Sequence, residues 1–361
     1  MKRFPFLDWM RGLAVVVMIQ CHAFNSLARL DVRDGGPYVF SQFVGGMAAP
    51  LFLFMAGMTF AFQMESLERR EPRALRRWLV SLRRAAYLMG IALAFRLSNW
   101  LGSYPNGGAA EVLKVDILNC MAVAMAVFAT LAVFDADDRS RWALVGAVGI
   151  ATLSPVMANL PWNGAPPLLR EYLVPIPGRG HFPLFPCASY LGFGLAMGTM
   201  VKRVAAERFE RLMQWSLAIG LGAAFVSQYF SNLPYSIYTK SNFWTDSPAL
   251  VFIRTGITLA VMACAYLWTE YGWPGWSWLE RLGKTSLMVY WVHVVLVYGA
   301  LAKPFKRTMS IPQTTLVTAG VTALMLLLSL LKLKWTARKA QRVRATQAAE
   351  DSRPVPEMSV S

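Results

Sequence analysis

Three polar side chains recur at helical spacing inside an apolar run near the start of the chain: Arg11, His22 and Asn25. Arg11 and His22 are eleven residues apart, which is three helical turns plus about 20°, so both lie on one face, roughly 16 Å apart along the axis. An unperturbed imidazole has a pKa of about 6.5, so His22 can act as a general base at neutral pH. The alternative is a structural histidine that a neighbouring helix satisfies.

A second polar stripe lies near the end of the chain. His293 is in the middle of an apolar run, with Tyr290 three residues and Ser286 seven residues before it, and the stripe ends at Lys284. Ionisable groups inside apolar spans are costly and usually mark a functional site. We therefore include His293 and Tyr290 in the candidate site.

Four further costly residues are expected at a similar depth. They are Arg96, Asp116, Asn119 and Arg254. An ion pair of Asp116 with Arg96 or with Arg254 is the structural alternative to a role in chemistry. All four are candidate site residues.

The composition predicts the elements that hold these residues. Hydrophobic residues make up 56% of the 361 residues and charged residues only 16%, against about a quarter in soluble domains. Runs of roughly 20 mostly apolar residues, the length of a membrane span, lie near 12–28, 43–63, 85–103, 116–134, 142–160, 183–201, 213–231, 249–269, 286–302 and 313–331. We predict an all-α integral membrane protein with about ten transmembrane helices. It has one polytopic domain over 1–335 and a polar, disordered cytoplasmic tail over 336–361.

Lys and Arg predict the orientation, because cytoplasmic loops carry an excess of basic residues. With both termini cytoplasmic, most of the 36 Lys and Arg residues fall inside, Arg139 among them. The largest cluster runs from Arg69 to Arg84, and contact with anionic headgroups explains most of it. This topology places Arg11 at the cytoplasmic mouth and His22 in the outer half of the membrane.

Other classes of site are excluded by what the sequence lacks. The four cysteines are far apart in apolar runs, so neither a disulfide framework nor a structural zinc site is expected. No glycine-rich phosphate loop, GxSxG elbow or HExxH motif occurs. The net charge of +16 fits a membrane surface rather than nucleic acid. We predict no metal and no nucleic-acid partner.

Four segments occur in an order that a known family shares. They are FLDWMRGLAVVVMIQCHAFNS, RALRRWLVSLRRAAYLMGIAL, HFPLFPCASYLGFGLAMG and LGKTSLMVYWVH, and they span about residues 4–302. Together they resemble membrane acyltransferases of the acyltransferase-three type. They are also similar to the related bacterial heparan-α-glucosaminide N-acetyltransferase-like proteins.

The resemblance implies transfer of an acyl group, typically acetyl from cytosolic acetyl-CoA, to a sugar, glycan or glycolipid on the far side of the membrane. By resemblance, Arg11 matches the family arginine, His22 the catalytic histidine and His293 the late histidine. Arg83 and Arg84 match the basic patch, although the Pro that many members carry after it is absent. Some relatives have their catalytic histidine in the first outer loop, where this chain has none. The subfamily and the acceptor therefore stay open.

The polar residues fit this chemistry, because a thioester is already activated and the enzyme mainly needs a base and an oriented acceptor. The residues expected to fix the tautomer of His22 are Asp116, Asn119 and Asn25. Those expected to polarise the thioester carbonyl or to contact the acceptor are Arg96, Arg254, Tyr290 and His293. Those expected to hold the phosphates of acyl-CoA are Arg11, Arg83, Arg84 and Lys284.

A transporter or flippase for an anionic or lipid-linked solute is the main alternative, because charged residues also line translocation paths. A non-catalytic anchor does not explain the two polar stripes. We predict a location in the bacterial cytoplasmic (inner) membrane, acyl-CoA as co-substrate, and membrane lipids and a saccharide or glycolipid acceptor as partners. The acyl chain, ester or amide linkage, direct transfer or an acyl-histidine intermediate, and a homo-oligomeric state stay open.

Overall fold

The framework is a bundle of helices. The computed structural model describes residues 4–103, 112–176, 182–272 and 275–351, and the last part of the predicted tail, 352–361, lies outside the described residues. The helices are α1 (Pro5–Leu27), α2 (Gly36–Gly45), α3 (Ala48–Glu68), α4 (Ala74–Ser103), α5 (Ile117–Ala129), α6 (Ala136–Asn159), α7 (Pro167–Leu173), α8 (Leu184–Arg203), α9 (Phe209–Ser231), α10 (Pro248–Tyr271), α11 (Trp278–Lys284), α12 (Ser286–Tyr298) and α13 (Ile311–Asp351). The described residues contain no strand beyond an isolated bridge between Ala28 and Met309.

Each predicted apolar run coincides with a helical segment. Six of the described segments are long and apolar enough to cross a membrane: Gly36–Glu68, Ala74–Leu101, Ala136–Asn159, Leu184–Arg203, Pro248–Tyr271 and Ile311–Gln341. Two shorter apolar segments are Ile117–Val133 and Ser286–Tyr298. The all-α membrane architecture is thus confirmed with six candidate spans, while about ten crossings and cytoplasmic ends stay predictions. α13 continues as one helix through 336–351, where the sequence suggested the start of a disordered tail.

The outer surface of the bundle is apolar over much of its area. Val145 on α6, Ile219 and Phe225 on α9, and Leu327 on α13 are all more than half exposed. Soluble monomers rarely expose contiguous apolar patches of large size, whereas lipid chains accept such side chains. The chain is therefore an integral membrane protein.

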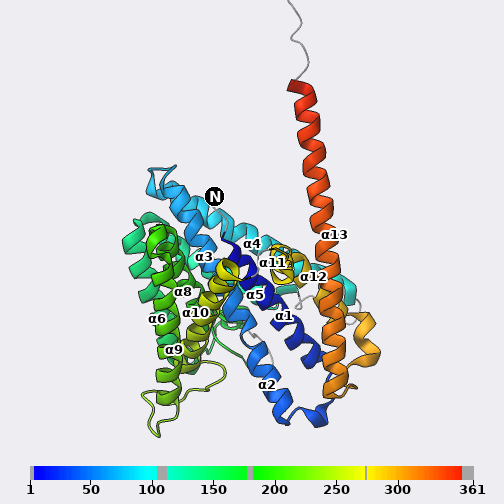
Figure 1. Ribbon diagram of the computed structural model, residues 1–361. Coiled ribbons are helices and arrows are strands. Elements are labelled where there is room, and N and C mark those ends of the chain that lie inside the picture. Colours follow the sequence, from blue (N-terminus) through cyan, green and yellow to red (C-terminus); the bar gives the residue numbers. More distant parts are fainter. Residues whose placement is uncertain (1–3, 104–111, 177–181, 273–274, 352–361) are drawn as a thin grey trace, which may run out of the picture.

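The helices pack in two groups around α1. α9 packs on α10, while α3 and α6 pack on α8, and Figure 1 shows α6, α8, α9 and α10 side by side on one side of the molecule. α11, α12 and α13 contact α1 from the other side, and α13 extends well beyond the bundle in Figure 1. α1 is consequently the central element on which both groups meet.

The contact between α1 and α11 is a backbone contact that only glycine permits. A Cβ atom at Gly283 would lie 1.8 Å from the carbonyl oxygen of Asp8, and one at Gly12 would lie 1.9 Å from that of Leu279. These two glycines belong to the LDxxRG and LGKTS segments. Their small size lets the two helices approach closely, as small residues do in membrane bundles.

From this contact onward, α1 and the α11–α12 segment keep one register. Gly12 meets Gly283, His22 meets His293, and the hydroxyl of Ser26 donates to the carbonyl oxygen of Val297 at 2.8 Å. In the last two pairs the partners are 271 positions apart, and Gly12 and Gly283 have the same separation. The two segments therefore run in the same direction without slipping.

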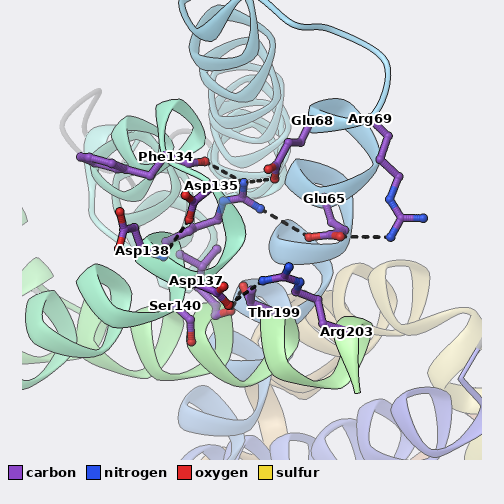
Figure 2. A network of polar contacts seen from close by, with 12 residues as sticks. Glu65, Glu68, Arg69, Phe134, Asp135, Asp137, Asp138, Ser140, Thr199 and Arg203 are labelled. Carbon is purple, nitrogen blue, oxygen red and sulfur yellow. Dashed lines mark hydrogen bonds and ion pairs between the residues drawn. The ribbon is translucent and has the colours of Figure 1, made fainter. Parts of the chain in front are cut away.

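A buried ion cluster ties α3 to α6 (Figure 2). Arg139 on α6 has no exposed surface, and its guanidinium bonds Glu68, lies 3.9 Å from Glu65 Oε2 and donates to the carbonyl oxygen of Phe134 at 2.9 Å. Glu65 also accepts from Arg69 at 3.0 Å. Arg139 is thus an internal partner of α3 rather than a basic residue of an exposed connector.

Gly283→Ala should lower the thermal unfolding midpoint of the detergent-purified protein, because the methyl group pushes α11 off α1; overpacking costs about 1–3 kcal/mol. Gly90→Ala on α4 is the matched control, since a Cβ there meets nothing within 4 Å. It should be neutral or stabilising by about 0.5–1 kcal/mol. Equal midpoints for the two variants would contradict the close-contact argument.

Arg139→Met should destabilise the protein by about 3–5 kcal/mol, because it removes a fully buried cation that Glu68 bonds and leaves the buried Glu65 with Arg69 alone. Arg203→Met is the control: its pair with Asp137 is exposed, so its loss should cost no more than about 1 kcal/mol. Adding Glu65→Gln and Glu68→Gln to Arg139→Met should restore part of the midpoint in a heat-unfolding measurement. No recovery in the triple variant would show that packing, not charge, carries the effect.

Candidate functional site

The two histidines that centre the two polar stripes are in direct contact. His22 Nδ1 lies 2.9 Å from His293 Nε2, and the two rings lie side by side with their centroids 5.1 Å apart and their planes within 11°. His293 is fully buried, whereas His22 keeps a partly exposed surface. The constant register of α1 and α12 therefore brings the two histidines together, with His293 buried and His22 still partly accessible.

The second nitrogen of His293 determines the protonation of the pair. His293 Nδ1 lies 2.7 Å from the carbonyl oxygen of Val289. A carbonyl oxygen can only accept, so His293 Nδ1–H donates to it, and Nε2 of the neutral ring only accepts. His22 Nδ1–H is then the donor across the pair, and His22 Nε2 keeps its lone pair. That is the state a general base requires.

This arrangement corrects one prediction. The sequence suggested that Asp116, Asn119 or Asn25 would fix the tautomer of His22, but His293 does so. The suggestion that His293 polarises a carbonyl is likewise replaced, because both of its nitrogens are already engaged. A ring of Tyr298 lies edge-on to His22, with centroids 5.4 Å apart, and closes another side of the imidazole.

An apolar cavity of about 320 Å³ opens beside α1 and carries two arginines, Arg11 and Arg84, in its lining. Arg11 is paired with the buried carboxylate of Asp8 at 3.3 Å, and Arg84 donates to Gln63. Most of the remaining lining is apolar and rich in methionine: Met18, Phe52, Met55, Ala56, Leu88, Ile91, Ile117, Leu118, Met121, Met125 and Leu287. We call it the arginine cavity. It combines two guanidinium groups with an apolar wall.

A second cavity of about 210 Å³ contains His22 and Arg254 and is called the histidine cavity. Its lining shares Met18, Phe52, Ile117 and Tyr290 with the arginine cavity. These four side chains therefore form the boundary where the two cavities meet. Arg11 and His22 lie on opposite sides of it, one in each lining.

Arg96, Asp116 and Tyr290 are neighbours. Arg96 is close enough to act electrostatically on both Asp116 and Tyr290, which favours the predicted proximity of Asp116 to Arg96. Asp116 also caps α5 by accepting from the backbone N–H groups of Leu118 and Asn119. Its first role is thus to begin a helix.

Four predicted residues are directed elsewhere. Asn119 is buried and donates to the hydroxyl of Tyr172 at 3.2 Å. Asn25 accepts from the hydroxyl of Tyr38 at 3.1 Å. The other two are Arg83, which is exposed, and Lys284, which pairs with Glu280 at 3.6 Å; neither is part of a cavity lining.

Sequence reasoning missed the contact between His22 and His293 and the boundary residues Phe52 and Ile117. A signal for the contact was present, since His22 follows Gly12 by ten residues and His293 follows Gly283 by ten. Nothing comparable marked Phe52 or Ile117, which look like any other apolar residue of a span. Within the described residues, no group of three or more His, Cys, Asp or Glu side chains could hold a metal ion.

A family model described as an acyltransferase domain, of the acyltransferase-3 type, matches residues 4–331. The match covers α1 and α12, and hence both histidines, and also every residue of the two cavity linings. No curated protein matches the chain.

Proposed function

The chain belongs to the acyltransferase-3 family, and from that premise we propose that it moves an acyl group, acetyl in the first instance, from cytosolic acyl-CoA to a saccharide on the outer side of the membrane. His22 is the general base. The observation that carries the proposal is the bond from His22 Nδ1 to His293 Nε2, which leaves His22 Nε2 as a proton acceptor in a cavity.

The donor occupies the arginine cavity. Arg11 and Arg84 bind the phosphates of acyl-CoA, because guanidinium groups form strong, forked hydrogen bonds to phosphate oxygens. The pantetheine arm lies along the methionine-rich wall, which is adaptable in shape. A rise of 1.5 Å per residue separates Arg11 from His22 by roughly 16 Å, a span that the extended arm crosses.

The reaction takes place at the boundary of the two cavities. His22 Nε2 removes the proton of an acceptor hydroxyl or amine, and the freed lone pair attacks the thioester carbonyl carbon. The tetrahedral intermediate collapses with cleavage of the C–S bond, and the CoA thiolate takes the proton back from His22. His293 stabilises the transient imidazolium of His22 by continuing to accept its Nδ1–H.

The orientation and the acceptor are part of the same proposal. Both chain ends face the cytoplasm, which puts the arginine cavity on the acyl-CoA side of a bacterial cytoplasmic membrane. The Phe-Pro and glycine-rich segment of α8 resembles the heparan-α-glucosaminide N-acetyltransferase-like branch, and this supports a sugar acceptor. Membrane lipids and acyl-CoA are the other partners, with no metal required.

His22→Ala should reduce acyl transfer by about 10²–10⁴-fold, the usual contribution of a positioned base. The measurement supplies labelled acetyl-CoA to inside-out vesicles and follows label on lumenal glycan or lipid. Gln20→Ala on the same helix is the control, since its side chain donates to the carbonyl oxygen of Ser41 and lines neither cavity. Transfer that survives His22→Ala would rule out His22 as the base. Solute flux without transfer from any acyl-CoA would favour a transporter.

Arg11→Gln should raise the KM for acetyl-CoA by about tenfold or more, the value of a lost hydrogen bond to a charged group, with a smaller change in kcat. With acetyl-pantetheine, which has no nucleotide phosphates, variant and wild type should react alike. Lys284→Gln should leave both KM values unchanged, because Lys284 lies off the cavity. A tenfold loss that persists with acetyl-pantetheine would assign Arg11 a structural role.

A further inference from the structure

The histidine cavity contains a cation for which it provides no anion. Arg254 on α10 lines it, and none of its lining residues is Asp or Glu. Within the described part of the chain, the buried Nε of Arg254 has no hydrogen-bond partner, and no carboxylate forms an ion pair with its guanidinium. The carboxylate nearest along the chain, Asp246, is held by Ser241 and by the N–H of Asn242 at 2.9 and 2.7 Å.

A guanidinium held in a membrane bundle without a counter-charge is costly. A protein keeps such a group where a ligand supplies the missing anion. Arg254 binds carboxylate and phosphate especially well, because its planar fork offers parallel N–H donors to two oxygens. The ligand that would compensate the charge of Arg254 in this cavity is therefore one with an anionic group.

Glycine makes the room for this guanidinium. A Cβ atom at Gly46 would lie only 2.6 Å from Arg254 Nη2, and one at Gly45 would lie 2.6 Å from the Cβ atom of Cys21. Cys21 directly precedes His22, so the Gly45–Gly46 corner between α2 and α3 adjoins both Arg254 and the base-bearing turn of α1. Arg254 and His22 thus line the same small cavity from two sides.

The size of the cavity limits its ligand. Its volume of about 210 Å³ is below the roughly 300–1,000 Å³ of pockets that take drug-sized ligands, and it suits one sugar ring rather than an oligosaccharide. We propose that the histidine cavity binds an anionic monosaccharide unit, whose carboxylate or phosphate is held by Arg254 while a hydroxyl faces His22. This inference rests on the proposed acyl transfer and specifies the class of its acceptor.

Binding without acyl-CoA separates this inference from catalysis. The full-length protein in detergent is titrated with glucuronate, glucose 6-phosphate, glucose and inorganic phosphate, and the thermal unfolding midpoint is followed, since a ligand that binds the folded state raises it. At least one anionic sugar should raise the midpoint at concentrations where glucose and inorganic phosphate do not. In His22→Ala the shift should still depend on the anionic group of the sugar, because Arg254 rather than His22 holds the carboxylate or phosphate.

Three variants test the role of Arg254. Arg254→Gln should weaken binding of the anionic sugar by about tenfold or more, and Arg254→Lys should weaken it less. Gly46→Ala keeps every charge but displaces the guanidinium, so it should also weaken binding. Arg29→Gln, at an exposed pair with Asp31, should leave the shift unchanged.

Several outcomes would overturn the proposal. A shift that survives Arg254→Gln, or no shift with either anionic sugar, would remove Arg254 as the anion site. An equal shift with inorganic phosphate would show that the cavity recognises an anion and not a sugar. If Arg254→Gln slows transfer to a neutral acceptor as much as to an anionic one and leaves binding intact, Arg254 serves the tetrahedral intermediate instead. If the protein binds the anionic sugar but transfers no acyl group to it, only the proposed function is contradicted.

Discussion

The close approach of two helix backbones at Gly12 and Gly283 is the constraint on which the site depends. A helix advances 1.5 Å per residue, so two parallel segments that keep one register bring residues at equal offsets from their contact to the same level, here ten residues beyond Gly12 and Gly283. There His22 meets His293. Two residues with no chemistry of their own therefore decide which ring nitrogens come into contact.

The two cavities differ in the charged groups that they hold. The arginine cavity places its charges beside an apolar wall, and the histidine cavity holds its own cation and the imidazole. Their shared boundary, built on Met18, Phe52 and Ile117 with Tyr290, is mostly apolar. In such a low-dielectric region hydrogen bonds are stronger than in water.

Periodicity in the sequence predicted the helices and identified both histidines, because apolar runs and polar stripes are local patterns. It could not show that the stripes face each other, since that depends on glycine packing between segments 271 positions apart. Asp116 and Asn119 were misjudged for another reason: an Asp three residues before an Asn, ahead of an apolar run, is an N-cap signal. The positive-inside rule counted Arg139 among the cytoplasmic charges but could not reveal its ion partners, because that rule counts charges without asking what they contact.

The ion cluster of Arg139 also bears on how the chain enters the membrane. Glu65 and Glu68 precede Arg139 in the sequence, so the ribosome delivers α3 before α6. When Arg139 emerges, Glu65 and Glu68 are already present on a preceding hairpin. Arg139 can therefore be buried together with its counter-charges, whereas burying an arginine without them is costly. The order of synthesis thus matches the order in which the charges are needed.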